Sequence, residues 1–203
     1  MAGKLIVIEG MDGTGTTTQA KMLATKLLAL NASVVESAEP TDSGIGQEIR
    51  RLLALPLDKE HDLLVSLALC FAADRMQHVS NVIAPGLKDK DFVLLDRYVL
   101  SSLVYQGLHI PTAFVKEINR FAPKPDLTLI LDLDVTLAHE RLSLRAKRRD
   151  FYETPSTLEK IRSRYLHFAK DEPAGTTVLI DASGSVEEVN SHILYVLREK
   201  RLF

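Results

Sequence analysis

The stretch that decides the fold is residues 5–19, which read LIVIEGMDGTGTTTQ. Four apolar residues predict a buried strand, and the glycines and threonines after them predict a loop that leads into a helix. The segment matches the phosphate-loop pattern G-x-x-x-x-G-K-[ST] at Gly10, Gly15 and Thr17, but Thr16 stands where the pattern has lysine. The alternative is a turn rich in glycine and threonine that binds no ligand.

Such a loop holds a polyphosphate largely through its main chain, because backbone N–H groups and the positive end of the next helix point at the anion. The Thr17 hydroxyl is expected to ligate Mg²⁺, which prefers oxygen ligands. Without the lysine charge, the loop should bind nucleotide but stabilise phosphoryl transfer less well by itself. Another cation must compensate for Thr16, or the activity is weak.

Length and composition predict one soluble globular domain. The chain has 203 residues, of which 46% are hydrophobic and 26% charged. A formal net charge of −2 gives no reason to expect a nucleic-acid polymer or an anionic membrane as a partner. The N-terminus lacks the signal-peptide pattern and no apolar run approaches membrane-spanning length, so we expect a cytoplasmic protein.

Short apolar runs alternate with amphipathic segments along the chain. We predict strands near 4–9, 32–36, 91–95, 127–132 and 177–181, and helices near 16–30, 44–54, 61–87, 135–148, 156–170 and 185–200. This alternation is typical of an α/β fold, a parallel sheet with helices on both faces. The runs at 92–95 and 127–131 read as continuously apolar, as strands buried on both faces do.

Ligands on such sheets collect at the carboxyl ends of the strands. Polar residues follow four of the predicted strands. They are the phosphate loop, Glu39-Pro40, Asp96-Arg97-Tyr98 and Asp181-Ala182-Ser183. Each alone reads equally well as a polar strand end, but their convergence at one edge favours a binding site.

Four motifs occur together with the loop: Asp12-Gly13, Phe71-Ala72-Ala73-Asp74-Arg75, Asp96-Arg97-Tyr98 with Ser101 and Gly107, and Pro123-Lys124-Pro125-Asp126. Their order and spacing resemble the thymidylate kinases over nearly the whole chain. The resemblance implies a P-loop nucleoside monophosphate kinase fold, with a five-stranded parallel sheet and a helical lid. It also implies phosphoryl transfer from ATP to dTMP with Mg²⁺, usually by a homodimer. The implied ATP-binding residues are Gly10, Asp12, Gly13, Thr14, Gly15, Thr16, Thr17 and Thr18.

The resemblance also assigns the nucleoside of the acceptor. Phe71 and Arg75 are four residues apart on a helix and share a face, where they would stack on thymine and hydrogen-bond a base carbonyl. The alternative is a core phenylalanine beside a solvated arginine. Asp12 would accept a hydrogen bond from the 3′-hydroxyl, or it only forms a turn. Tyr105 would lie against the deoxyribose.

For the acceptor phosphate, the resemblance points to Arg97, with its fork of donors. Asp96 would lie near the metal and the transferred group, so the implied metal residues are Thr17 and Asp96. The alternative for Asp96 and Arg97 is a structural salt bridge. The full implied substrate-binding set is Asp12, Glu39, Phe71, Arg75, Arg97, Ser102, Tyr105 and Gln106.

A cluster of cations resembles the family's lid, at about 141–154. Five cations occur in nine residues with no acid among them: Arg141, Arg145, Lys147, Arg148 and Arg149. Gly13 is typical of relatives that carry arginines in the lid rather than in the loop. The expected catalytic residues are therefore Arg145, Lys147, Arg148, Arg149 and Asp96. The alternative is a basic, solvated helix face.

Two further positions depart from the family pattern. Ala38 replaces an arginine that often precedes Glu39, and Phe151 replaces a lid arginine. Arg50 or Arg51 are candidates to replace the first, and Arg148 or Arg149 the second. Three hypotheses follow: a Mg²⁺-dependent dTMP kinase, a kinase for another pyrimidine deoxynucleotide such as dUMP, or a catalytically weak nucleotide-binding paralogue with a regulatory or partner role.

Overall fold

The computed structural model describes residues 3–55, 61–144, 152, 154–171 and 176–203. The strands β1 (Lys4–Gly10), β2 (Val34–Ala38), β3 (Phe92–Asp96), β4 (Leu127–Asp132) and β5 (Thr176–Asp181) form one sheet. The strand order is β2-β3-β1-β4-β5, and all neighbouring pairs are parallel. The predicted parallel sheet is confirmed, although β2 lies two residues later in the chain than expected.

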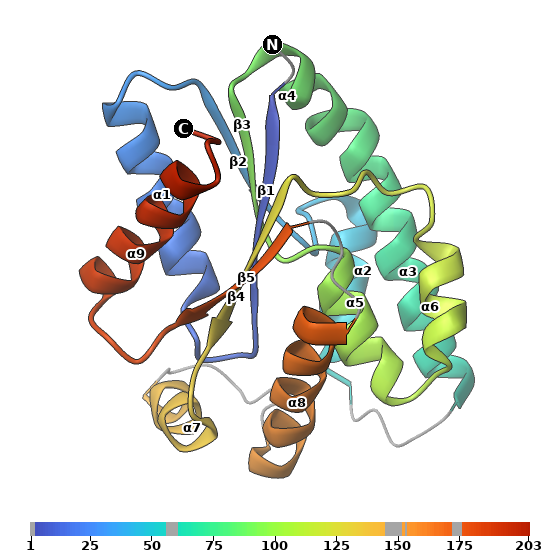
Figure 1. Cartoon of the computed structure of the whole chain (residues 1–203). Coiled ribbons are helices and arrows are strands. Elements are labelled where there is room, and N and C mark those ends of the chain that lie inside the picture. The colour runs from blue at the N-terminus through green and yellow to red at the C-terminus, as the bar shows by residue number, and fades with distance from the viewer. Residues whose placement is uncertain (1–2, 56–60, 145–151, 153, 172–175) are drawn as a thin grey trace.

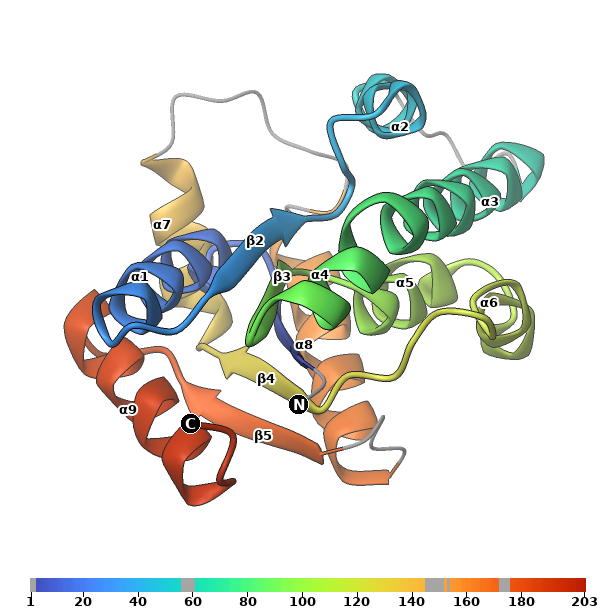
Figure 2. The same ribbon diagram turned by 90° about the horizontal axis from the view of Figure 1, so that it is seen from above.

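Helices cover both faces of the sheet (Figures 1 and 2). One face carries α1 (Thr16–Ala29) and α9 (Val186–Glu199); the other carries α3 (His61–His78), α4 (Ala84–Asp89), α5 (Val99–Tyr105) and α8 (Pro155–Asp171). The helices α2 (Gly44–Leu53) and α6 (Thr112–Ile118) pack against α3, and α7 (Val135–Ser143) lies near the carboxyl end of β4. No helix among the described residues is both long enough and apolar enough to cross a membrane.

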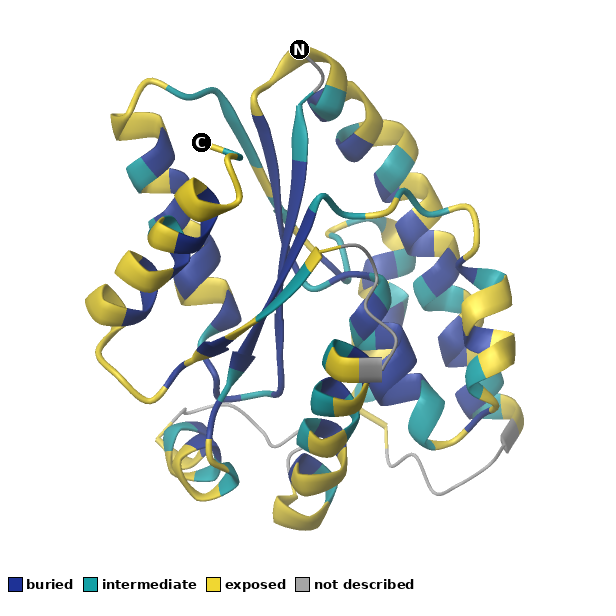
Figure 3. Cartoon of the chain, in the orientation of Figure 1, coloured by how far each residue is buried: buried dark blue, intermediate teal, exposed yellow. Residues whose placement is uncertain are grey.

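The central strands are buried on both faces, as their continuous apolar runs predict (Figure 3). In β1 the alternation of side chains divides the core. Ile6 and Ile8 pack in one cluster with Leu23 of α1, whereas Leu5 and Val7 pack in a second cluster against the opposite face. Both faces of β1 are thereby packed against core side chains, so the phosphate loop begins at a strand that is held on both sides.

The helix predicted over 61–87 is divided in the structure. It consists of α3, a π-helical turn at Val79–Ile83, and α4. Pro85 lies in the first turn of α4. Proline has no N–H to donate and its ring crowds the carbonyl four residues earlier, so the hydrogen-bond pattern changes just before it.

Two helices, α5 and α6, lie outside the predicted segments. Five of the seven residues of α5 are buried, so its sequence lacks the polar face that marks an amphipathic helix. The helix α6 has only seven residues. The predicted helix at 135–148 is observed as α7 up to Ser143, and residues 145–148 lie outside the described part of the chain.

Candidate active site

The phosphate loop joins β1 to α1 at the carboxyl edge of the sheet (Figure 1). Gly13 and Gly15 have φ values of 90° and 92°, in the left-handed region that favours glycine. A Cβ atom at Gly13 would lie 2.6 Å from the carbonyl oxygen of Ala138 in α7. Gly15 is the N-cap of α1. Because glycine has no side chain, the cap offers no acceptor to the first N–H groups of the helix, which remain available for an anion.

Neighbouring residues of this loop line two different cavities. The first, of about 200 Å³, is called the Arg97 cavity. The second, of about 350 Å³, is called the Arg141 cavity. Asp12 lines the Arg97 cavity and its neighbour Gly13 lines the Arg141 cavity. Ligands in the two cavities would therefore approach each other across the loop.

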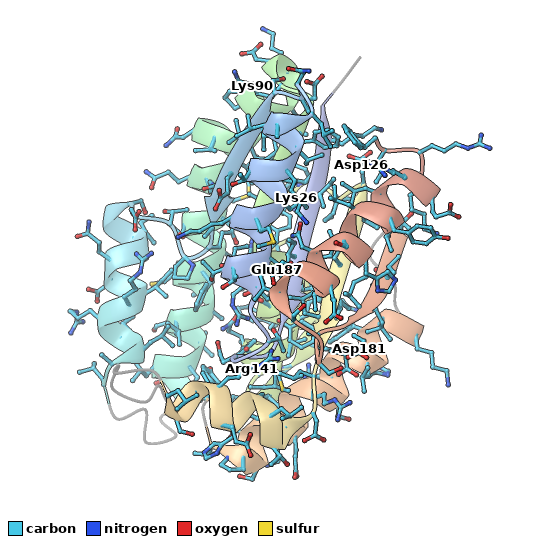
Figure 4. All side chains as sticks on the ribbon, turned by 90° about the vertical axis from the view of Figure 1, so that its left-hand side faces the viewer. Lys26, Lys90, Asp126, Arg141, Asp181 and Glu187 are labelled. Atoms are coloured by element: carbon cyan, nitrogen blue, oxygen red, sulfur yellow. The ribbon has the colours of Figure 1, made fainter. Side chains whose placement is uncertain are left out.

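The Arg141 cavity lies between the phosphate loop, the end of α7 and the start of α9. Figure 4 shows Arg141 on the same side of the molecule as Asp181. Both terminal nitrogens of Arg141 donate to the carbonyl oxygen of Ala182, at 3.2 Å each. Arg141 is the only cation among the described residues that line this cavity.

Arg97 directs its side chain from the end of β3 toward the phosphate loop. Its φ of 69° is unusual for a residue with a side chain; such backbone strain costs about 1–3 kcal/mol and is concentrated at functional sites. Nη2 donates to Asp12 Oδ1 at 2.8 Å, and Nη1 donates to the Gly10 carbonyl at 2.9 Å. The guanidinium carbon lies 5.2 Å from the centre of the Tyr105 ring. Arg97 therefore links β3, the loop and α5.

Glu9 precedes the loop and is fully buried. Its Oε1 accepts hydrogen bonds from the N–H groups of Tyr98 (2.9 Å) and Ser101 (3.1 Å). Its Oε2 accepts from the hydroxyls of Ser101 (2.6 Å) and Tyr165 (3.0 Å). Burial raises the pKa of Glu9, while the Ser101 hydrogen bond and the charge of Arg97 oppose that rise. The carboxylate thus fixes the start of α5, immediately after Arg97.

Arg75 is buried in the wall of the Arg97 cavity. Nε donates to Glu39 Oε2 at 2.8 Å, Nη2 donates to the Ser102 hydroxyl at 3.1 Å, and Nη1 donates to Asn119. The other oxygen of Glu39 lies 3.0 Å from His78 Nδ1. Both oxygens of Glu39 are thus engaged by protein groups, so Glu39 anchors Arg75.

Near Arg75, the cavity offers a ligand two further polar groups. Gln106 Oε1 is buried and has no hydrogen-bond partner among the described residues. The Tyr105 hydroxyl donates to Asp12 Oδ2 at 3.0 Å. Phe71 lines the same cavity, four residues before Arg75 on α3. The cavity is thus lined by an aromatic ring, a guanidinium group and an amide whose oxygen is unpaired among the described residues.

Thr17 and Asp96 lie where the loop approaches the end of β3. The Thr17 hydroxyl donates to Asp96 Oδ2 at 2.5 Å. Asp96 Oδ1 is buried and has no hydrogen-bond partner in the described part of the chain. A free carboxylate oxygen beside a hydroxyl is a donor set that suits Mg²⁺, which takes few protein ligands and completes its shell with water and phosphate.

The structure brings most of the predicted residues to the two cavities. All eight predicted substrate-binding residues and Asp96 line the Arg97 cavity. Gly13, Thr14, Gly15 and Thr18 line the Arg141 cavity. Gly10, Thr16 and Thr17 are among the residues that line neither. The predicted catalytic cations lie outside the described residues: Arg145, Lys147, Arg148 and Arg149.

The candidates to replace the arginine missing at Ala38 do not line the Arg97 cavity. Arg50 Nη2 donates to the Pro40 carbonyl at 2.8 Å, and Arg51 pairs with Glu48 on the surface of α2. Arg50 therefore supports the loop after β2 through its backbone.

Several contributing residues were not predicted, among them Glu9, His78, Asn119 and Tyr165. Glu9 and His78 carried a local signal, because Glu9 is a carboxylate at the end of an apolar run and His78 lies three residues after Arg75 on α3. Buried charge of that kind needs partners. Asn119 and Tyr165 reach the site from remote segments, and no local pattern marks them.

A parallel sheet with a phosphate loop at its carboxyl edge, and two cavities lined by that loop, defines a P-loop nucleotide-binding protein. A family model described as thymidylate kinase matches residues 8–193. The chain is 37% identical to a probable thymidylate kinase of Pyrococcus horikoshii, over 100% of this chain and 99% of that protein. It is 40% identical to a thymidylate kinase of Xanthomonas oryzae pv. oryzae, over 92% of this chain and 79% of that protein. The chain belongs to the thymidylate kinase family and has its P-loop nucleoside monophosphate kinase fold.

Gly13→Ala should weaken ATP binding at least about tenfold, or about 1.4 kcal/mol. The added Cβ would meet the Ala138 carbonyl, and alanine disfavours a φ of 90°. Calorimetric titration with ATP measures the effect. Gly44→Ala is the matched control, since a Cβ there meets nothing within 4 Å. Unchanged ATP affinity in Gly13→Ala would contradict the assigned loop geometry.

Proposed function

We propose that this protein transfers a phosphoryl group from ATP to dTMP, giving dTDP and ADP, in pyrimidine deoxynucleotide synthesis. The observation that carries the proposal is that the neighbouring loop residues Asp12 and Gly13 line two different cavities, with Arg97 hydrogen-bonded to Asp12. The names of the relatives, thymidylate kinase, support dTMP as the acceptor.

The Arg97 cavity is the proposed acceptor site. Thymine presents a carbonyl acceptor beside an N–H donor, and Arg75 with Gln106 offers the complementary donor and acceptor. Cytosine reverses both groups and would leave the buried amide oxygen unpaired. Pro40, Leu53 and Phe71 also line the cavity. These apolar side chains suit the 5-methyl group, which favours dTMP over dUMP.

The acceptor's sugar and phosphate would follow the base toward the loop. We assign Tyr105 to the deoxyribose, Asp12 to the 3′-hydroxyl and Arg97 to the phosphate. Tyr105 and Asp12 already share a hydrogen bond, and both contact Arg97. These three side chains would orient the attacking phosphate oxygen, and Arg97 would stabilise its charge.

The Arg141 cavity is the proposed site of ATP, with its phosphates on the N–H groups of the loop and of α1. Thr17 and Asp96 are the residues that would hold Mg²⁺. The ion, when bound, would neutralise charge on the phosphate oxygens. Thr16 leaves that charge without the family's loop lysine. We propose that Arg145, Lys147, Arg148 and Arg149, in a lid at about 141–154, supply the missing charge.

The proposed assembly is a homodimer of single-domain chains in the cytoplasm, where ATP is available. The apolar residues Leu69, Ala73 and Met76 are exposed along one face of α3, and Leu69 and Met76 are 46% and 37% exposed. That face is the proposed contact between two copies. Sedimentation equilibrium of Met76→Asp, beside the control Leu28→Asp on α1, measures whether α3 holds the dimer.

A coupled assay with ATP and Mg²⁺ tests the function. We expect dTMP to be phosphorylated at about 1–100 s⁻¹, dUMP less efficiently because it lacks the methyl group, and dCMP at least about tenfold less efficiently than dTMP. Nearly equal turnover of dTMP and dCMP would overturn the base assignment. Absence of turnover with every monophosphate would favour the nucleotide-binding paralogue.

Arg97→Ala should abolish productive dTMP binding and leave ATP affinity nearly intact, because the guanidinium is assigned to the acceptor phosphate. Loss of such a charge-assisted contact costs about 2–5 kcal/mol. Titration with each nucleotide separates the two effects, and Arg120→Ala on the surface is the control. A loss of dTMP affinity below about threefold, well under 1 kcal/mol, would contradict the assignment.

The replacement of the loop lysine is tested by Thr16→Lys. If the lid cations supply the charge, this substitution should raise kcat by less than about tenfold, or 1.4 kcal/mol of barrier. Neutralising the four lid cations together should lower kcat by about a thousandfold. Thr25→Lys, elsewhere on α1, is the control. A nearly inert protein that Thr16→Lys activates by several powers of ten would contradict compensation by the lid.

A further inference from the structure

Tyr165 connects α8 to Glu9 at the end of β1 and to Arg97 and Ser101, which lie just after β3 and in α5. It is 2% exposed. Its hydroxyl donates to Glu9 Oε2 at 3.0 Å, lies 3.0 Å from the Ser101 hydroxyl, and accepts from Arg97 Nη1 at 3.5 Å. Neither Tyr165 nor Glu9 is among the described residues that line either nucleotide cavity. Tyr165 therefore contacts Arg97 without itself lining the cavity into which a ligand would bind.

The hydroxyl is the part of Tyr165 that needs an explanation. The ring packs edge-on against Tyr105, with centroids 6.4 Å apart, and a phenylalanine ring would fill the same space. A hydroxyl that is removed from water is costly unless it is hydrogen-bonded. Here it is bonded to a buried carboxylate, and a hydrogen bond to a charged group is stronger than one between neutral groups.

All four hydrogen bonds at Glu9 have its carboxyl group as the acceptor, an arrangement that favours the ionised form. Ser101 and Tyr165 are the two donors to Oε2, and Arg97 is the cation that faces the carboxylate. The other charged or titratable groups around Arg97 are Asp12, Asp96 and Tyr105. Loss of one donor would weaken the ionised form of Glu9 and, with it, the attachment of the residues around Arg97.

We propose that Tyr165 and Glu9 form a positioning pair for Arg97. They hold the start of α5 and the guanidinium group where the acceptor phosphate binds, and neither touches the substrate. This inference rests on the proposed function, because it takes Arg97 as the acceptor-phosphate ligand. It assigns to α8 a role in acceptor binding that its sequence does not mark.

Tyr165→Phe tests the proposal, since it removes the hydroxyl and keeps the ring. We expect KM for dTMP to rise at least about fivefold, while KM for ATP stays within about twofold. Tyr195→Phe is the matched control, because Tyr195 is 58% exposed on α9, and it should change neither value. Glu9→Gln keeps the shape and removes the charge. When Tyr165→Phe is combined with Glu9→Gln, KM for dTMP should be less than twofold higher than in Glu9→Gln alone.

The pH dependence of kcat/KM for dTMP tests the proposal separately, because a purely structural role of Tyr165 would leave that dependence unchanged. A hydrogen bond to the charged form of an acid lowers its pKa, so removing the Tyr165 hydroxyl should raise the pKa of Glu9 further. The acidic limb of kcat/KM for dTMP should therefore move to higher pH in Tyr165→Phe. In Glu9→Gln, the addition of Tyr165→Phe should leave the limb where it is.

The outcomes separate the two proposals. An active parent enzyme with an unchanged Tyr165→Phe variant overturns the positioning pair and leaves the kinase proposal standing. Equal rises in KM for both nucleotides with a lowered Tm and an unmoved acidic limb show a structural role only, which also overturns it. A parent protein that neither binds nor phosphorylates dTMP overturns the kinase proposal and, with it, the positioning pair.

Discussion

The buried carboxylate of Glu9 is the interaction on which the arrangement of the site depends. Taking an ion out of water costs several kcal/mol unless other groups satisfy it, and here four hydrogen bonds from Tyr98, Ser101 and Tyr165 do so. Those donors come from the residue after Arg97, from α5 and from α8. The carboxylate therefore fixes the end of β1, immediately before the phosphate loop, to the residue after Arg97, to α5 and to α8.

Adjacent residues of the loop face different cavities, and the two cavities differ in how they would hold a nucleotide. The Arg141 side offers mainly backbone and small side chains, as a main-chain phosphate cradle requires. The Arg97 side offers charged and aromatic side chains locked by buried partners. Thr16 therefore changes the charge of a site whose shape is set by the glycines. We expect a substitution of this kind to affect transfer more than binding.

The parallel sheet, the phosphate loop and most residues that line the Arg97 cavity were predictable because each depends on a local pattern or on the family's motifs. The helix α5 was not, since burial on nearly all sides removes the polar face that periodicity detects. The partners of the site residues were also beyond local reasoning. Tyr165 meets Glu9 across 156 positions of sequence. Glu39, predicted to bind substrate, lines the cavity with both oxygens already engaged.

We propose that the two cavities hold donor and acceptor end to end across the phosphate loop. A thymidine and an adenosine joined through five phosphates would span both. Calorimetric titration should show one molecule bound per chain, at least about a hundredfold more tightly than dTMP or ATP alone, since the second nucleoside binds intramolecularly. Binding no tighter than that of the better single nucleotide, or two molecules bound per chain, would contradict the account.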